Sequence, residues 1–404
     1  MKKVLMAGTF DIIHPGHINL IKQAKSLGDF LVVVIGRDQN VFNAKGRKPY
    51  YNERQRLENL NALLNFKSET LNPKQSQNSK FQTQNFYKIV LGDIEDPYKI
   101  IKDEKPDIIA LGYDQQNYVE GLKKWIHDTR YTIQVTRLKP FKKDVCKGKN
   151  IRKAVEDNQS GFLLVDKEES WTSHDVVAKL RSITGIKQIG HTGTLDPFAT
   201  GLLICAFSQA TKMVGMFDVL PKTYEATIRL GVVSDTYDRT GKIEDLRFKI
   251  KDRRSKIEVS ENQIRDVLVS FIGKQEQVPP MFSAKKIQGR KLYELARKGG
   301  EVERQPSEIE IYNIDELKSK IKNQRSAAGH EIFSIQVKCS TGTYIRTLAH
   351  DIGQKLGTGA ILEELKRTAI GDFNVSQTVQ LDQLTKDNYS KYLIRPLEAL
   401  AKMV

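Results

Sequence analysis

Short apolar runs alternate with longer amphipathic stretches through the first third of the chain. A run of about four to eight apolar residues between turn signals is typical of a buried β-strand. Five runs fit this description: Val4–Ala7, Phe30–Ile35, Lys88–Leu91, Ile108–Leu111 and Tyr131–Val135. Because helical stretches separate these runs, we expect a parallel sheet in an α/β domain over residues 1–141.

Two polar stretches interrupt this pattern. Residues 67–88 are rich in Gln, Asn, Ser and Lys and nearly empty of aliphatic side chains, so we expect a mobile surface insertion there. Residues 142–160 are again charged and polar, and the apolar run Phe162–Val165 follows them. This change predicts a linker at 142–160 and a second domain from residue 161.

In the second domain, apolar and polar residues alternate along the chain, as in strands that bury only one face. Tyr224–Leu230 and Ile332–Lys338 place apolar and polar residues on alternating positions. Strands of this kind usually form antiparallel sheets with one solvated face. We therefore expect an α+β fold with a mainly antiparallel sheet over residues 161–404.

Composition narrows the possible partners. The 404 residues include 65 Lys and Arg against 49 Asp and Glu, and the net charge of +16 favours a polyanion. No apolar run reaches the roughly 18 residues of a membrane span, and the N-terminus lacks the pattern of a secretory signal. These features predict a cytoplasmic protein without a membrane partner. Three widely spaced cysteines predict reduced structural thiols rather than a zinc site.

The first candidate site lies between the first strand and the first helix. Residues 8–17 read G-T-F-D-I-I-H-P-G-H, and Pro15 suits a first helical turn. His14 and His17 would share one face of the helix at its N-terminus, where phosphate oxygens bind readily. Cationic or hydrogen-bonding imidazoles there would stabilise charge on an α-phosphate and on a pyrophosphate leaving group.

This segment resembles the HxGH nucleotidyltransferases, especially archaeal-type FAD synthase and, second, glycerol-3-phosphate cytidylyltransferase. The likeness continues through G-R-D at 36–38, K-G-R-K-P at 45–49, E-R-Q-R-L at 53–57 and P-D-I-I-A-L-G-Y-D-Q at 106–115. It implies a Rossmann-like fold that transfers an adenylyl or cytidylyl group from ATP or CTP, with magnesium, to a small phosphate ester such as FMN. The implied nucleotide-binding residues are Thr9, Phe10, His14, Gly16, His17 and Asp114.

The domain departs from that family near its end. Relatives commonly carry a Ser/Thr-rich phosphate-binding motif there, whereas this chain has K-G-K-N-I-R-K at 147–153. Basic side chains can still bind phosphate. The departure bears on the substrate and on whether this domain is active, and a degenerate nucleotide-binding domain is the alternative.

The second candidate site surrounds Asp196. Residues 190–203 read G-H-T-G-T-L-D-P-F-A-T-G-L-L, which fixes the acid between a leucine and a proline after two glycines. Glycines allow close approach of a backbone to a ligand, and proline restricts the loop. The pattern therefore predicts a positioned carboxylate.

The string resembles the catalytic motif of the TruB-type tRNA pseudouridine synthases. Six further motifs follow this family's pattern in order: V-D-K at 165–167, K-T-Y at 222–224, S-D-T-Y-D at 234–238, P-M-F-S-A-K-K at 280–286, T-G-T-Y-I-R-T-L at 341–348 and L-K-R at 365–367. The segment G-R-K-L-Y-E at 289–294 belongs to the same series. The resemblance implies an isomerase that converts uridine 55 of the tRNA T loop to pseudouridine without a cofactor. The chain leaves little room for the PUA domain that many relatives carry after the catalytic domain.

The resemblance assigns roles to residues in these motifs. Asp196 would act as a nucleophile toward the sugar or the base, or as a base that forms an elimination intermediate. Arg346 would pair with Asp196 and keep it ionised, and Tyr224 would stack on the uracil near its C5 proton. The implied substrate-binding residues are His191, Tyr344, Leu365, Lys167 and Asp238, while Lys366 and Arg367 would meet the RNA backbone.

Two other functions fit the same residues. The second domain could serve as a tRNA-binding folding chaperone, with an inactive first domain that senses nucleotides. Alternatively, only the nucleotidyltransferase could be active. Against the chaperone, binding alone needs no enclosed acid such as Asp196. The leading prediction is a bifunctional RNA isomerase and nucleotidyltransferase.

Overall fold

The computed structural model describes residues 1–70, 86–116, 118–246, 259–283, 286–287, 290–292, 302–317 and 330–403. These residues form two compact units, Met1–Ser160 with Arg395–Val404 and Gly161–Ile394. Within the described residues, no helix is long and apolar enough to cross a membrane.

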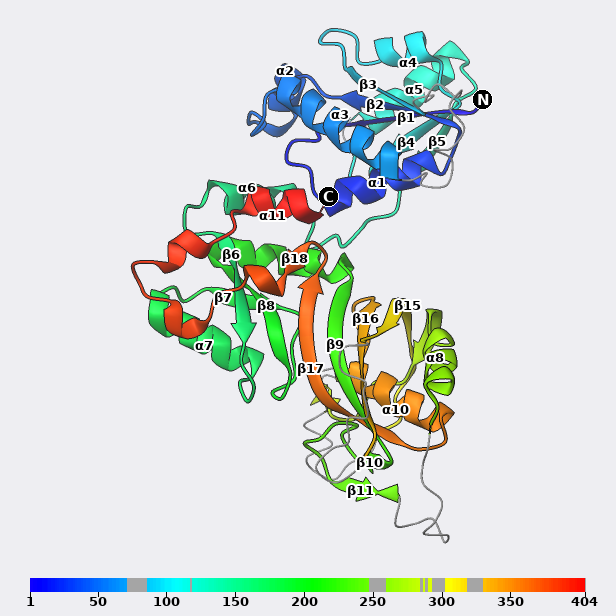
Figure 1. The fold of residues 1–404 in the computed structure, drawn as a ribbon. Helices are drawn as coiled ribbons and strands as arrows, with labels where there is room; N and C mark the ends of the chain where they lie inside the picture. Colours follow the sequence, from blue (N-terminus) through cyan, green and yellow to red (C-terminus); the bar gives the residue numbers. More distant parts are fainter. Residues whose placement is uncertain are drawn as a thin grey trace. The chain divides into compact units, whose positions relative to one another are not determined.

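The first unit is a five-stranded parallel sheet flanked by helices (Figure 1). Its strand order is β3-β2-β1-β4-β5, so β2 and β3 lie on one side of β1, and β4 and β5 lie on the other. Apolar clusters cover both faces of the sheet, as expected for parallel strands. The elements are β1 Lys3–Gly8, α1 Pro15–Lys25, β2 Phe30–Ile35, α2 Asp38–Lys45, α3 Glu53–Thr70, β3 Tyr87–Leu91, α4 Lys99–Glu104, β4 Ile108–Leu111, α5 Val119–Thr129, β5 Gln134–Arg137, α6 Gly148–Glu156 and α11 Pro396–Met403.

The second unit is built on a nine-stranded sheet in the described residues. Its main path runs β12-β15-β16-β9-β17-β8-β6, and all neighbours are antiparallel except β17 and β8. The helices α8 and α10 pack with the β9, β15 and β16 core (Figure 1). The expected α/β and mainly antiparallel α+β folds are therefore confirmed.

The strands and main helices of this unit follow in chain order, together with its long 3₁₀ helix η1: β6 Gly161–Lys167, α7 Ser173–Thr184, β7 Ile189–Thr192, β8 Thr200–Phe207, η1 Ser208–Val219, β9 Lys222–Leu230, β10 Val232–Ser234, β11 Ile243–Asp245, α8 Glu261–Val269, β12 Gly273–Gln277, β13 Lys286–Ile287, β14 Arg290–Lys291, β15 Ser307–Glu316, β16 Ile332–Cys339, α10 Ile345–Lys355, β17 Ala360–Ile370 and β18 Phe373–Asn374.

The structure differs from the sequence-based expectations at three segments. The strand expected at Tyr131–Val135 begins only at Gln134 and runs to Arg137, while Tyr131 stacks on Trp125 of α5 with 5.4 Å between ring centroids. α3 extends to Thr70 and β3 begins at Tyr87, so both ends of the expected insertion at 67–88 are in regular structure. The rest of that expectation, residues 71–85, lies outside the described residues.

The third difference concerns the expected linker at 142–160. This segment contains α6, which buries Ile151 and Ala154 completely and belongs to the first unit. Two buried apolar residues spaced three apart on a short helix suffice to anchor it. The many lysines of this segment made it resemble a solvated linker, so the sequence pattern did not predict the helix.

Candidate active sites

The loop after β1 forms one wall of a cavity of about 600 Å³ in the first unit. Phe10 adopts a positive φ of 47°, which is uncommon outside glycine, and its side chain is buried. The fully buried Arg56 of α3 holds this loop, because its guanidinium donates to the carbonyl oxygens of Thr9 and Gly36 and to Asp38. A conformation of this kind persists only where its surroundings enforce it.

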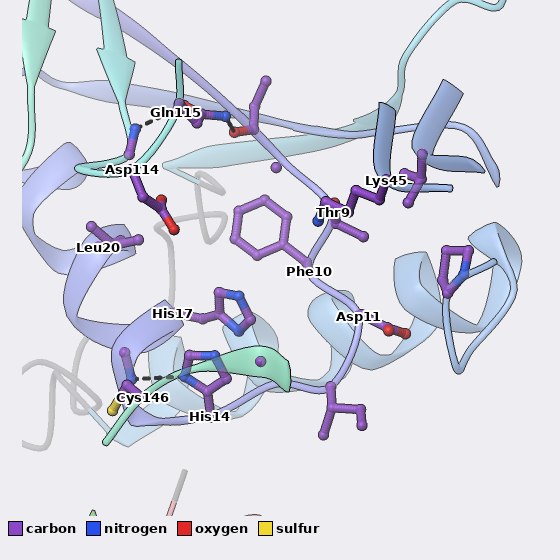
Figure 2. A pocket seen from close by; sticks show the side chains of 18 of the residues that line it. Thr9, Phe10, Asp11, His14, His17, Leu20, Lys45, Asp114, Gln115 and Cys146 are labelled. Carbon is purple, nitrogen blue, oxygen red and sulfur yellow. Dashed lines mark hydrogen bonds between the residues drawn. The ribbon is translucent and has the colours of Figure 1, made fainter. Parts of the chain in front are cut away.

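His14 and His17 lie together at the start of α1, beneath Phe10 (Figure 2). Their rings stack with 3.9 Å between centroids. His14 is the N-cap residue, and its Nδ1 accepts a hydrogen bond of 3.1 Å from the backbone N–H of Gly16. A Cβ at Gly16 would lie 2.9 Å from the His14 ring, so this position requires glycine. With Nδ1 an acceptor, the neutral His14 ring carries its proton on Nε2.

Both imidazoles are neutral at pH 7. Burial, followed by the charge of His17, lowers the pKa of His14 well below its ordinary value. Burial, followed by Lys45, lowers the pKa of His17 to about 4. Of the two forms considered from the sequence, the structure therefore favours the hydrogen-bonding imidazole over the cation.

These pKa values predict a pH-dependent stability of the first unit. The pKa of His17 rises from about 4 to 6.5 on unfolding, so the unfolded chain binds more protons between these values. Stability is then lost as pH falls from 6.5 towards 4, by up to about 1.4 kcal/mol per pH unit for His17. Urea unfolding in a Trp171→Phe background follows this unit through Trp125 fluorescence. His17→Gln is expected to flatten the slope, and an unchanged slope would refute the assignment.

Basic side chains surround the rest of the cavity. Lys45, Arg47, Lys48 and Arg152 line it, and Lys45 Nζ donates to the Thr9 hydroxyl at 2.8 Å. Burial, followed by Arg47, lowers the pKa of Lys45. Such a ring of cations is suited to a triphosphate. Asp114 points into the cavity from the far side (Figure 2).

The basic motif at 147–153 reaches this cavity through α6. Gly148, the first residue of α6, and Arg152, one turn later, both line it. This wall of the cavity thus offers a helix N-terminus and a guanidinium. Both are phosphate-binding groups.

The Asp196 loop of the second unit connects β7 with β8. Arg346, in the first turn of α10, makes a two-point ion pair with Asp196, with Nε–Oδ2 at 2.9 Å and Nη2–Oδ1 at 3.1 Å. Asp238 Oδ2 lies 3.6 Å from Arg346 Nε. The remaining donors reach the carbonyl oxygens of Thr236 at 3.1 Å and Phe282 at 2.7 Å. The pairing expected from the sequence is present.

The charges around Asp196 oppose one another. Loss of hydration raises the pKa of Asp196, and Asp238 raises it further, whereas Arg346 and Lys167 lower it. The net direction is upward, so Arg346 limits the effect of burial without cancelling it. An acid of raised pKa is suited to proton transfer as well as to nucleophilic attack.

Asp238 organises the S-D-T-Y-D loop. Its Oδ1 accepts from the hydroxyl of Thr236 at 2.7 Å and from the backbone N–H and hydroxyl of Thr240 at 2.8 and 2.6 Å. Its side chain is buried. Asp238 therefore stabilises the loop and supports Arg346. Because its side chain is buried in these contacts, we do not assign it to substrate binding, which was the role implied by the resemblance.

Tyr224 and Leu365 lie on neighbouring strands, β9 and β17. Leu365 pairs with Ala226 in the register and packs in the same apolar cluster as Leu195 and Phe198, which flank Asp196. Tyr224 packs against this cluster, and burial raises its pKa. The loop with Asp196 and the two strands thus share one core.

His191 and Tyr344 come from two further elements, β7 and the residue before α10. His191 lies in β7, edge-on to His174 with 5.5 Å between centroids, and burial, then His174, lowers its pKa to about 4. Tyr344 precedes α10, and Gln277 bonds both its backbone N–H and its carbonyl, at 2.8 and 3.1 Å. No sequence signal had singled out Gln277.

Lys167 and Arg367 differ from their expected roles. Lys167 is fully buried, and its ammonium donates to the carbonyl oxygens of Glu168, Trp171 and Pro197. Arg367 is also buried and donates to the carbonyl oxygens of Leu202 and Gly193, so it does not meet an RNA backbone. Both side chains hold the Asp196 loop from within.

Lys167 is therefore expected to matter for stability. Lys167→Met removes a fully buried ammonium group and with it the donor of three partly buried carbonyl oxygens, which costs about 2–4 kcal/mol of unfolding free energy. Chemical denaturation followed through Trp171 measures this. Lys179→Met, at an exposed position of α7, is the control and should stay within about 0.5 kcal/mol of wild type. Equal stabilities of the two variants would contradict the assignment.

Protein-family models match both units of the chain. A family model described as TruB family pseudouridylate synthase (N terminal domain) matches residues 181–345, and one described as tRNA pseudouridylate synthase B C-terminal domain matches residues 346–402. A cytidylyltransferase-like model matches residues 5–159. The two folds and these matches thus define a pseudouridine synthase preceded by a nucleotidyltransferase-like domain.

Individual relatives specify the family. The tRNA pseudouridine synthase B of Geotalea uraniireducens is 42% identical over 60% of this chain and 74% of its own length. That of Clostridium tetani is 41% identical over 60% of this chain and 78% of its own length. The chain belongs to the TruB family. A chain of a Cbf5-Nop10-Gar1 complex is 27% identical, with a TM-score of 0.46, over 63% of this chain and 64% of that chain.

Proposed function

We propose that the second unit isomerises uridine 55 in the T loop of tRNA to pseudouridine. The observation that carries this proposal is the two-point pair between Asp196 and Arg346, in a chain whose relatives are tRNA pseudouridine synthases. The reaction breaks the N1–C1′ bond, turns the base and joins C5 to C1′. It involves no net redox change and so requires no cofactor.

Each step calls on groups that the site provides. Asp196 attacks the nucleotide or removes a proton from it, and Arg346 stabilises the carboxylate in either role. Tyr224 and Leu365 enclose the uracil, and Tyr344 covers its other face. His191 contacts the displaced nucleotide, which has to leave its stack to reach Asp196.

The test of this activity is nucleoside analysis of a tRNA transcript after incubation with the protein alone. We expect about one pseudouridine per tRNA without added nucleotide or metal. A chaperone would bind the transcript and leave its uridines unchanged. Binding measured in parallel separates that outcome from failure to engage the RNA.

We further propose that the first unit transfers an adenylyl or cytidylyl group to a small phosphate ester such as FMN, in the cytoplasm. The cavity combines the Nε2–H donor of His14 and the neutral imidazole of His17 with four basic side chains at a helix N-terminus, which supports binding of a triphosphate. Magnesium would accompany the triphosphate as part of the substrate. Asp114, which also lines the cavity, would contact the base or the ribose in this proposal.

Pyrophosphate release tests the second proposal. The protein is incubated with ATP or CTP and magnesium, with FMN or glycerol-3-phosphate as acceptor. Release that requires one nucleotide and one acceptor identifies the pair. Absence of release with every pair would refute the proposed transfer.

A further inference from the structure

Arg367 is a buried cation at the centre of the second unit. Only 1% of it is exposed, yet in the part of the chain that the structure describes no carboxylate lies within ion-pair distance of its guanidinium. A buried charge without a counter-ion is costly, so its environment has to offer compensating polar groups. Arg367 Nε donates to the carbonyl of Leu202 at 2.8 Å, and Nη2 to that of Gly193 at 2.9 Å.

Gly193 is the first residue of the loop that carries Asp196, and Leu202 lies in β8, just after the loop ends. Gly193 has a φ of 58°, and a Cβ there would lie 3.2 Å from Arg367 Nη1. At Gly201, with a φ of 95°, a Cβ would lie 2.4 Å from the Arg367 carbonyl oxygen. The motif's glycines therefore make room for Arg367, which connects the two ends of the loop.

Tyr224 faces the same guanidinium. Arg367 on β17 is the cross-strand partner of Tyr224 on β9, and residues paired in this way point to the same face of the sheet. The Arg367 side chain interacts with the Tyr224 phenol and lowers its pKa, against the larger effect of burial. The other titratable groups near this phenol are Cys339 on β16 and Asp196.

We propose that Arg367 is a positioning residue for Tyr224: it ties the phenol to the Asp196 loop and supplies the positive charge that the phenol oxygen faces. The inference rests on the proposed function only in assigning Tyr224 to the uracil. An arginine suits this role better than a lysine, because its planar group addresses two carbonyl groups and a phenol at fixed angles.

Carbon-13 NMR tests the contact without any activity. The protein is labelled at tyrosine Cζ, and the Tyr224 signal is identified by its loss in Tyr224→Phe. Arg367→Met is expected to shift this signal, whereas Lys366→Met is not. Lys366 is the matched control, because it is an exposed cation at the adjacent position of β17. A Tyr224 signal that Arg367→Met leaves in place would overturn the proposal.

A double-mutant cycle on uridine conversion tests the function of the contact. In wild type, Arg367→Met should lower kcat by about 10- to 100-fold with KM for tRNA changed less than about threefold. In the Tyr224→Phe background, the same change should cost less than about threefold. An equal loss in both backgrounds would mean that Arg367 supports the fold alone and would overturn the proposal.

Arg367→Lys provides the comparison if Arg367→Met does not fold, as judged by circular dichroism. Lysine keeps the charge but cannot reproduce the fork, so partial recovery of kcat is expected. An inactive wild-type protein would refute the proposed isomerase, while the NMR comparison would still decide whether Arg367 acts on Tyr224.

Discussion

Replacement of Asp196 by Asn is expected to abolish pseudouridine formation while tRNA binding persists. The amide is almost isosteric and can still accept from Arg346, but it can neither attack carbon nor remove a proton. We expect a loss of at least about 10³-fold in the single-turnover rate.

The effect on stability separates chemistry from folding. Asparagine removes one charge from a cluster in which Arg346 also contacts Asp238, so Arg346 keeps a counter-ion. Unfolding free energy should therefore change far less than the rate, and filter binding of tRNA should change less than about threefold. A variant that retained a tenth of the wild-type rate would exclude Asp196 as the reacting group.

Replacement of His14 by Ala is expected to give the largest loss in the first unit. His14 Nδ1 is occupied by the Gly16 N–H, which leaves Nε2–H to donate to a phosphate oxygen as charge develops. Loss of such a donor costs about 10²- to 10³-fold in pyrophosphate release. The same change also removes the cap of α1, which costs about 1 kcal/mol of stability.

His127→Ala is the matched control, since His127 has a side chain that is 90% exposed on α5. It should release pyrophosphate at the wild-type rate. If His14→Ala did the same, His14 would have a structural role only. The isomerase activity of the second unit should be unaffected by either variant.

The sequence predicted those features that depend on local pattern. The apolar runs at 30–35 and 108–111 coincide with β2 and β4, because buried parallel strands require continuous apolar residues. The meeting of Asp196 and Arg346, which are 150 positions apart, came from motif resemblance and not from periodicity.

The features that sequence could not predict are set by burial. Lysine and arginine usually lie at the protein surface, and only the fold shows that Lys167 and Arg367 are buried among backbone carbonyl oxygens. Helix α6 in the polar segment at 142–160 was not predicted, because only Ile151 and Ala154 anchor it and its other residues resemble solvated surface. Neither case contains a local signal that distinguishes a buried cation or a short helix from solvated surface.

Release of tritium from tRNA labelled at uridine C5 tests the central claim most directly. The new bond to C1′ forms at C5, so each isomerisation releases one C5 hydrogen to water. We predict about one tritium per tRNA with wild-type protein, and none from a transcript with cytidine at position 55. No release while tRNA stays bound, or equal release from the cytidine transcript, would contradict the account.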